Sequence, residues 1–269
     1  MPDLISPDEL TELLAQGREM TLLDVRWQLG RTDGYDEYLA GHLPGASYVD
    51  LETDLADPAG DGGRHPLPDP ERFAQAMRRC GVNRSRTVVV YDATAGLAAT
   101  RAWWLLRYHG HPDVRLLDGG WTSWRGPVET GETRVPAGDF ESDPGHLAVI
   151  EADGAADVAR RGVLLDARAP ERFRGEREPV DPVAGHVPGA VNLPTAENLR
   201  DDRWKSTDEL AEIYAVTDRG GPVAVYCGSG VTATHDLFAL HLIGRGGALY
   251  AGSWSHWVTD PDRPVATGP

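Results

Sequence analysis

Short apolar runs alternate with amphipathic stretches along the chain. The runs VVVY at 88–91 and VAVY at 223–226 are apolar without the alternation of a half-exposed strand. Such runs are typical of strands covered on both faces in a largely parallel sheet. The stretches at 100–110 and 232–244 instead place apolar residues three and four apart, as helices do. The pattern predicts an α/β fold in which mostly parallel sheets are flanked by helices.

A long internal repeat organises the chain. Four segments of the first half return in the same order in the second half, and 269 residues suit two domains of ordinary size. The matching pairs are LLDVR at 22–26 with LLDAR at 164–168, GHLPGA at 41–46 with GHVPGA at 185–190, VVVYDATAG at 88–96 with VAVYCGSG at 223–230, and GGWTSW at 119–124 with GSWSHW at 252–257.

A stretch rich in proline, glycine and charged residues separates the two copies at about 126–150. Such composition is typical of a connection between domains. We therefore expect a first domain at 1–130, a linker at 131–150 and a second domain at 151–269.

The composition narrows the classes of partner and compartment. The chain has 26 basic and 42 acidic residues, a net charge of −16, which disfavours nucleic acid and anionic membranes as partners. No apolar run approaches the roughly 18 residues of a membrane span, and the N-terminal stretch resembles a capped helix rather than a secretory signal. We expect a cytoplasmic protein.

The cysteine count limits covalent and metal chemistry. Only Cys80 and Cys227 are present, so neither a disulfide framework nor a four-thiolate metal site is indicated. His109 and His111 lie close together without further candidate ligands nearby, which favours a solvated turn over a metal site. These residues therefore give no indication of a metal site.

Cys227 stands at a predicted strand-to-helix turn. It follows VAVY directly and precedes Gly228, Ser229 and Gly230. Ligand sites form at the carboxyl ends of strands in open α/β sheets, and a helix N-terminus stabilises an anion there. The glycines allow successive amides to turn toward the sulfur. The turn predicts a reactive thiolate, against the alternative of a small buried side chain at a strand end.

The two copies differ at this point. The first has Asp92 where the second has Cys227, so a single copy carries the nucleophile. Cys80 follows a helical stretch without flanking glycine-serine-glycine, which indicates a structural cysteine. Ser229 has no G-x-S-x-G surroundings, which favours a hydroxyl donor over a nucleophile.

These segments together resemble the rhodanese family, specifically its tandem-domain sulfurtransferases of the thiosulfate and 3-mercaptopyruvate type. YLAGHLPGASYV at 38–49, LDGGWTSW at 117–124 and YAGSWSHW at 250–257 are similar to family signatures, and CGSGVTA at 227–233 is similar to the active loop. The resemblance implies two rhodanese-like domains, of which the first is catalytically silent.

The resemblance also implies a covalent cycle that needs no metal and no organic cofactor. Cys227 takes a sulfane sulfur from 3-mercaptopyruvate or thiosulfate, and the persulfide passes it to cyanide or to a thiol such as thioredoxin or a low-molecular-weight thiol. The backbone amides of the loop would hold the persulfide, and the residues that carry them are Gly228, Ser229, Gly230, Val231 and Thr232.

The residues after the cysteine bear on the choice of donor. Family members that prefer thiosulfate carry basic residues there, whereas Gly228 and Ser229 are similar to the mercaptopyruvate type. Arg172 fits the family position that holds the donor carboxylate. The usual second arginine is not evident, although Arg177 lies in that stretch, so both donors stay open.

The mercaptopyruvate enzymes also imply a serine, a histidine and an aspartate at the site. The matching residues are Ser229, His42 and Asp33. His42 has an alternative structural role, because His186 occupies the same place in the second copy and both can tie down a Pro-Gly turn.

Two other functions fit parts of the sequence. A dual-specificity type phosphatase needs Cys-x5-Arg around phosphate, but position 233 is alanine. A binding or regulatory rhodanese-like module without activity is the other alternative, and the retained cysteine loop disfavours it.

Overall fold

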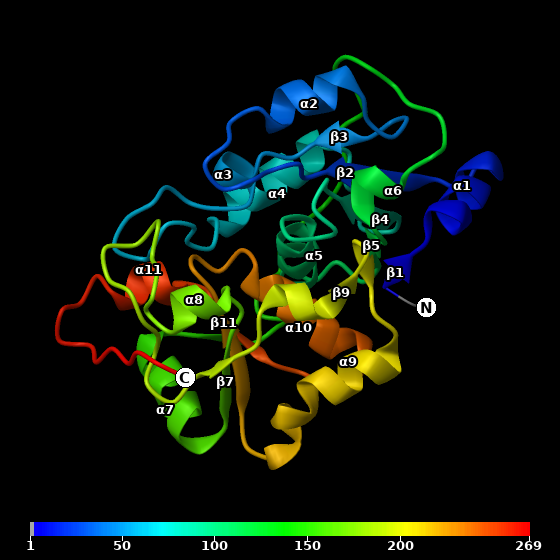
Figure 1. Ribbon diagram of the computed structural model, residues 1–269. Helices are drawn as coiled ribbons and strands as arrows, with labels where there is room; N and C mark the ends of the chain where they lie inside the picture. Colours follow the sequence, from blue (N-terminus) through cyan, green and yellow to red (C-terminus); the bar gives the residue numbers. More distant parts are fainter. Residues whose placement is uncertain (1–2) are drawn as a thin grey trace. The chain divides into compact units, whose positions relative to one another are not determined.

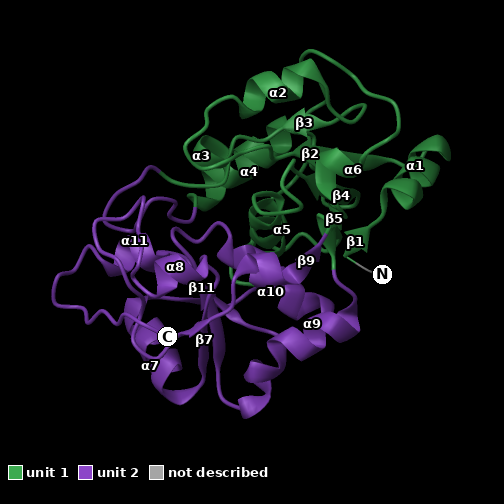
Figure 2. Cartoon of the chain, viewed as in Figure 1, with its two compact units in different colours: residues 1–57, 68–146, 201–204 green, residues 58–67, 147–200, 205–269 purple. Residues whose placement is uncertain are grey.

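The computed structural model describes residues 3–269 as two compact units, shown in different colours in Figure 2. Each unit draws mainly on one half of the sequence and takes a short segment from the other half. Unit 1 comprises residues up to Asp57, Pro68–His146 and Asp201–Trp204, and unit 2 comprises Pro58–Leu67, Leu147–Arg200 and Lys205–Pro269. The domain ranges expected from the sequence, 1–130 and 151–269, stay a prediction.

Unit 1 is built on a five-stranded parallel sheet with strand order β1-β5-β4-β2-β3 (Figure 1). Its strands are β1 (Leu4–Ile5), β2 (Met20–Asp24), β3 (Ser47–Tyr48), β4 (Thr87–Tyr91) and β5 (Val114–Leu117). Its helices are α1 (Pro7–Ala15), α2 (Gly34–Ala40), α3 (Leu51–Asp54), α4 (Pro70–Arg79), α5 (Ala99–Tyr108) and α6 (Gly120–Ser123).

Unit 2 repeats this sheet with the order β6-β12-β11-β7-β8, again with parallel pairing throughout. Its strands are β6 (Val149–Ile150), β7 (Val163–Asp166), β8 (Val191–Asn192), β11 (Val223–Tyr226) and β12 (Ala248–Tyr250). Its helices are α7 (Ala152–Arg161), α8 (Pro170–Phe173), α9 (Thr207–Ile213), α10 (Ala233–Leu242) and α11 (Ser253–Trp257), with 3-10 turns at η1 (Thr195–Asn198) and η2 (Tyr214–Arg219). The short strand β9 (Leu199–Arg200) also lies in unit 2, whereas β10 (Arg203–Trp204) belongs to the unit 1 segment Asp201–Trp204.

The apolar runs form the central strands, as predicted. VVVY lies within β4 and VAVY is β11, and these residues are buried except for the partly buried Val223. The predicted helical stretches coincide with α5 and α10, which pack against β4 and β11 respectively. The α/β class and the duplicated parallel sheet are therefore confirmed.

The repeated D-x-R element buries an ion pair in each unit. In unit 1 the guanidinium of Arg26 pairs with Asp24 at 2.6 Å and donates to the carbonyl oxygen of Gly41 at 2.6 Å. It also lies over the ring of Trp121, 4.8 Å from the centroid. One arginine thus joins a strand end, the GH-x-PGA turn and the tryptophan helix.

Unit 2 repeats the arrangement closely. Arg168 pairs with Asp166 at 2.6 Å, donates to the carbonyl oxygen of Gly185 at 2.7 Å and lies 4.7 Å from the ring centroid of Trp254. A buried charge is tolerated because its donors are satisfied. The motifs shared by the two halves therefore form a common structural frame.

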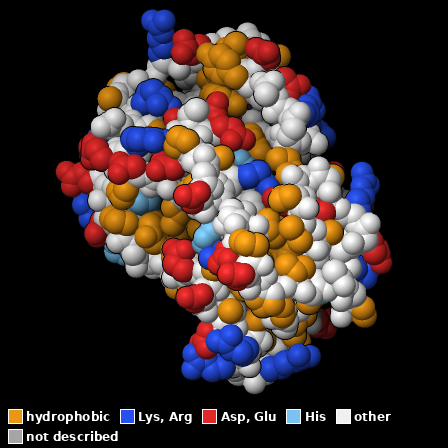
Figure 3. All heavy atoms as spheres, turned by 90° about the vertical axis from the view of Figure 1, so that its left-hand side faces the viewer, with side chains coloured by type: hydrophobic (Ala, Val, Ile, Leu, Met, Phe, Trp, Pro, Cys, Tyr) orange, Lys and Arg blue, Asp and Glu red, His pale blue; other side chains and the backbone are white. Residues whose placement is uncertain are grey.

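Among residues 3–269 no helix is long and apolar enough to cross a membrane. No cluster of three or more histidine, cysteine and acidic residues in this range could hold a metal ion. Acidic side chains are spread over much of the face drawn in Figure 3.

Candidate functional site

The loop from Cys227 to Thr232 joins β11 to α10 at the carboxyl end of the unit 2 sheet. The Cys227 sulfur accepts a hydrogen bond from the backbone N–H of Gly230 at an N–S distance of 3.2 Å. The cysteine is only 1% exposed. The predicted strand-to-helix turn is present, and one predicted amide contact to the sulfur is made.

Glycine is required at position 230 by the shape of this loop. Gly230 has φ of +78°, and a Cβ there would lie 2.3 Å from the carbonyl oxygen of Ala251. A side chain would therefore be strained by the backbone angle and would also clash with the neighbouring backbone. The amide that reaches the sulfur depends on the absence of this side chain.

Ser253 fixes the backbone of the cysteine. Its hydroxyl accepts a hydrogen bond from the N–H of Cys227 at 3.1 Å, and the N–H of Trp254 donates to the Cys227 carbonyl oxygen at 3.0 Å. Ser253 has φ of +55°, a conformation that non-glycine residues rarely adopt. Strain of this kind is concentrated where it positions functional groups.

Ser229 faces a histidine from a distant part of the sequence. Its hydroxyl lies 2.7 Å from Nδ1 of His65, and both side chains are buried. His65 belongs to the segment Pro58–Leu67, which is part of unit 2. Gly60 and Gly63 pair through two backbone hydrogen bonds and form a tight turn just before this histidine.

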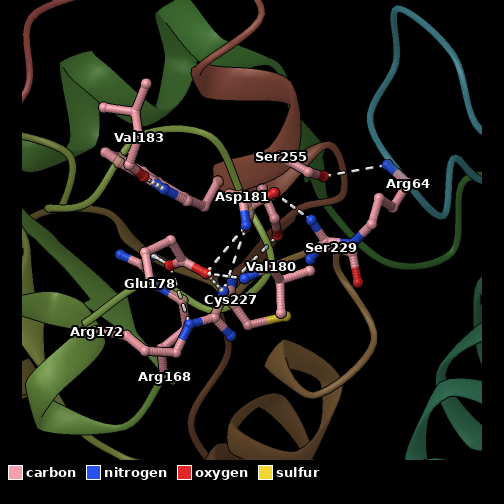
Figure 4. Close-up of polar contacts among 12 residues, drawn as sticks. Arg64, Arg168, Arg172, Glu178, Val180, Asp181, Val183, Cys227, Ser229 and Ser255 are labelled. Atoms are coloured by element: carbon pink, nitrogen blue, oxygen red, sulfur yellow. Dashed lines mark hydrogen bonds and ion pairs between the residues drawn. The ribbon is translucent and has the colours of Figure 1, made fainter. Parts of the chain in front are cut away.

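Two arginines flank Gly228, the residue after the cysteine. A Cβ at Gly228 would lie 3.0 Å from Nη2 of Arg64 and 3.4 Å from Nη1 of Arg172. Arg172 donates from Nε and Nη2 to the two carboxylate oxygens of Glu178 at 3.0 and 2.6 Å. Asp181 pairs with both arginines, through Arg64 Nη1 and, at 3.2 Å, through Arg172 Nη2. Figure 4 shows this cluster beside Cys227.

The pKa values of the two carboxyl groups in the cluster are shifted in opposite directions. Burial raises the pKa of Asp181 above its usual value, and the charge of Arg64 opposes this shift only in part. Burial also acts to raise the pKa of Glu178, but the hydrogen bond from Arg172 and backbone donors outweigh it and hold that pKa below its usual value.

The structure brings together most of the site residues predicted in the second half. Arg172 lies beside Gly228, and Val231 is buried while Thr232 precedes the first residue of α10. Arg177 differs, because it is exposed and only its backbone N–H makes a hydrogen bond, to Glu171. The prediction of Arg177 as a donor-binding residue thus gains no contact with the loop.

His42 and Asp33 belong to unit 1 and have other partners there. Nδ1 of His42 lies 2.9 Å from the carbonyl oxygen of Tyr38, and Nε2 lies 2.8 Å from the Thr133 hydroxyl. Asp33 is ion-paired with Arg31, and this interaction lowers the pKa of the exposed Asp33 carboxyl. The histidine that contacts Ser229 is therefore His65 rather than His42.

His186 repeats the structural contact of His42. Its Nδ1 lies 2.7 Å from the carbonyl oxygen of Phe173, and the following residue, Val187, donates its N–H to the Tyr226 hydroxyl at 3.1 Å. In unit 1 Leu43 donates in the same way to Tyr91. The histidine of each GH-x-PGA element thus ties its turn to the frame.

Four residues near the loop were not predicted from the sequence, and they are Arg64, His65, Glu178 and Asp181. The segment DPAGDGGRHPLP at 57–68 carried a signal, since three glycines and three prolines surround one arginine and one histidine. Because that segment precedes the cysteine by some 160 positions, its place in unit 2 is not readable from local pattern.

Comparisons with known proteins agree with this geometry. The family model described as "Rhodanese-like domain" matches residues 6–126 and again 151–260. "Putative thiosulfate sulfurtransferase SseB" of Mycobacterium tuberculosis is 43% identical over 280 residues, covering 98% of this chain and 97% of that protein.

Two further proteins match over nearly their full length. "Probable 3-mercaptopyruvate sulfurtransferase" of Pseudomonas aeruginosa is 44% identical over 279 residues, covering 98% of both chains. The crystal structure of SseA from Escherichia coli, described as a 3-mercaptopyruvate sulfotransferase, superposes with a TM-score of 0.82 at 35% identity, covering 95% of this chain and all of that one. The chain therefore belongs to the rhodanese family, among its tandem-domain sulfurtransferases.

Proposed function

We propose that this enzyme moves a sulfane sulfur from a small anionic donor to a thiol or cyanide through a persulfide on Cys227. The observation that carries the proposal is the placement of the sulfur, which accepts an amide hydrogen bond in a loop flanked by Arg64 and Arg172. Cationic groups beside a nucleophilic sulfur favour an anionic donor and the charge that develops in transfer.

The first half of the cycle forms the persulfide. The Cys227 thiolate attacks the donor sulfur, and the carbon–sulfur bond of 3-mercaptopyruvate, or the sulfur–sulfur bond of thiosulfate, breaks with its electron pair on the leaving group. Pyruvate enolate leaves in the first case and takes up a proton, whereas sulfite leaves in the second. Amides of the loop hold the outer sulfur.

The second half returns the enzyme to its starting state. An acceptor thiolate or cyanide attacks the outer sulfur of the persulfide, the sulfur–sulfur bond breaks and the Cys227 thiolate leaves. The products are an acceptor persulfide or thiocyanate. The physiological acceptor is a thiol, as either a protein or a low-molecular-weight thiol, and the site of action is the cytoplasm.

The hydrogen-bonded pair of Ser229 and His65 supports 3-mercaptopyruvate as the preferred donor. Its leaving enolate needs a proton, and a serine hydroxyl 2.7 Å from an imidazole nitrogen forms a relay that can supply one. Sulfite needs no such proton. His65 thus takes the role that the family resemblance gave to His42, and thiosulfate is the alternative donor.

Mass spectrometry of the purified enzyme tests the proposal. After incubation with 3-mercaptopyruvate or thiosulfate, we expect Cys227 to gain the mass of one sulfur atom, and cyanide to remove it as thiocyanate. Cys80→Ser is the matched control, because Cys80 is buried and burial raises the pKa of its thiol to about 11. Absence of added sulfur on Cys227 with both donors would sink the proposal.

Comparison of two variants tests the donor preference. His65→Gln is expected to reduce turnover of 3-mercaptopyruvate more than that of thiosulfate, because only the first reaction needs the proton. His42→Gln is expected to affect both donors equally and mainly through stability. Equal losses with both donors in His65→Gln would argue against the relay.

A further inference from the structure

Arg64 occupies the position that a second donor-binding arginine would need. Arg172 lies beside Gly228, and the stretch that follows it supplies the exposed Arg177, which makes no contact with the loop. Arg64 comes from the separate segment Pro58–Leu67, and apart from the chain neighbours of Gly228 its Nη2 lies closest to the point where Gly228 would carry a Cβ. Its backbone N–H donates to the Ser255 hydroxyl at 3.1 Å, which anchors it beside α11.

Each guanidinium group has nitrogens that bind a carboxylate and a nitrogen beside Gly228 that does not, and we call the side with that nitrogen its open edge. Arg64 uses Nη1 for Asp181, whereas its buried Nε has no hydrogen-bond partner in the described chain. Arg172 uses Nε and Nη2 for Glu178 and Asp181, and its Nη1 faces Gly228. The open edges of both guanidinium groups thus lie against the residue next to the reactive sulfur.

The carboxylates hold the open edges in place before a ligand arrives. Asp181 contacts both arginines, and its side chain is only 3% exposed. A guanidinium fixed by such a partner loses less side-chain entropy when it binds an anion than a free one does. The two arginines and two carboxylates balance in charge, so a ligand is held by directed hydrogen bonds rather than by a large net charge.

We propose that Arg64 is the second donor-binding arginine of this enzyme, and that its open edge and that of Arg172 together bind the oxyanion end of the sulfur donor. Asp181 is the positioning residue that bridges them. This inference rests on the proposed function and deepens it. The oxyanion is the carboxylate of a mercapto-acid or the sulfonate of thiosulfate, which present the same kind of acceptor oxygens.

Steady-state kinetics of Arg64→Gln test the inference. Because hydrogen bonds to charged groups are lost, KM for the preferred donor should rise about 10- to 100-fold while kcat changes little. Arg64→Lys keeps the charge without the planar guanidinium group, so its KM should lie between those of the wild-type enzyme and Arg64→Gln. Arg174→Gln is the matched control, since Arg174 pairs with Glu176 at the surface and should leave both constants unchanged.

A binding measurement separates donor affinity from catalysis. In a Cys80→Ser background, pyruvate and sulfate carry the two oxyanion types without a transferable sulfur, and either can protect Cys227 from iodoacetamide. The concentration of the effective anion needed for protection should rise at least about tenfold in Arg64→Gln, in step with KM. The unprotected alkylation rate should stay within about twofold, and the arm that protects identifies the oxyanion.

The outcomes distinguish this inference from the proposed function. If the wild-type enzyme forms no persulfide, the proposed function fails. If the persulfide forms but Arg64→Gln keeps the wild-type KM and protection, Arg64 does not bind the donor, and a raised KM in Arg177→Gln would assign that role to Arg177. Arg64→Gln leaves the buried Asp181 carboxylate without one of its two arginine partners, and the double variant Arg64→Gln/Asp181→Asn removes that negative charge. If donor affinity and stability both recover in the double variant, the loss in Arg64→Gln came from the carboxylate, and the inference is overturned.

Discussion

The Asp92 loop of unit 1 and the Cys227 loop of unit 2 follow equivalent strands but hold different groups. In unit 1 each carboxylate oxygen of Asp92 accepts two backbone N–H groups, and the four donors are Thr94 at 2.8 Å, Gly96 at 2.9 Å, Ala98 at 2.8 Å and Ala99 at 2.9 Å. In unit 2 the Cys227 sulfur accepts the N–H of Gly230 at 3.2 Å.

The difference teaches what the loop does by itself. The same turn directs backbone amides at one side chain in either unit, because a glycine-containing loop at a helix N-terminus collects amide donors. In unit 1 that side chain is a carboxylic acid, whereas in unit 2 it is the thiol of Cys227. We therefore expect unit 1 to be inactive, because its loop carries no nucleophilic sulfur.

The largest effect should come from making the second loop like the first. Cys227→Asp removes the nucleophile and supplies a carboxylate for the same amides, so persulfide formation should fall at least about 10³-fold while the fold is kept. Donor assays with circular dichroism check both parts. Turnover that survived on Cys80 alone would contradict the assignment of the single reactive sulfur.

Removing the Asp92 carboxylate from its four amide donors should affect stability rather than activity. Asp92→Ala leaves four backbone donors without their acceptor in a buried site, so the free energy of unfolding should fall by about 3 to 5 kcal/mol. Asp92→Asn keeps an acceptor oxygen, so its free energy of unfolding should fall by less. Urea unfolding measures both variants. A loss below about 1 kcal/mol in Asp92→Ala would mean that the loop rearranges and its amides find other acceptors.

A matched pair of glycine variants separates the roles of the two loops. Gly230→Ala brings a Cβ to 2.3 Å from the Ala251 carbonyl oxygen and displaces the amide beside the sulfur, so persulfide formation should slow about 100-fold. Gly96→Ala, at φ of +100° and with a Cβ 3.1 Å from Leu116, should lower stability by about 1 to 2 kcal/mol and leave turnover unchanged. Rapid-quench kinetics and urea unfolding check the pair. Equal turnover in both variants would contradict a catalytic role for the Gly230 loop and a purely structural role for the Gly96 loop.

The helices that follow the loops should differ in their response to pH. Asp236 in α10 is fully buried, and burial raises the pKa of its carboxyl to about 8, opposed by hydrogen bonds from Asn198 and Tyr214. In the native state this carboxyl is protonated at neutral pH. Its contribution to stability is complete below the unfolded-state pKa of about 4 and is lost as pH rises through about 8, by at most about 1.4 kcal/mol per pH unit.

Asp236→Asn should remove this pH dependence with little change in packing. Urea unfolding between pH 5 and pH 9 measures the slope in both proteins. Asp208→Asn, an exposed aspartate on α9, is the control and should keep the wild-type slope. An unchanged slope in Asp236→Asn would show that other groups control the pH dependence.

The sequence predicted what is local and what is repeated. The apolar runs predicted the central strands, and the repeat predicted two similar α/β units, which the matching strand orders confirm. Cys227 could be found because its glycines are neighbours along the chain and because Asp92 marks the same place in the other copy.

Contacts between distant segments were beyond local pattern. The resemblance assigned His42 to Ser229, but His42 makes the same turn contact as His186, and the histidine that reaches Ser229 is His65. The glycine turn before His65 belongs to unit 2 although its sequence lies in the first half. Spacing and propensity do not encode such an exchange of segments.

The exchanged segment Pro58–Leu67 also limits how the gene can be divided. A fragment with only the second half would keep Cys227 and Arg172 but would lack Arg64 and His65. The first half of the sequence thus supplies two side chains to the site in unit 2. Expressing the halves as separate chains would divide that site between two polypeptides.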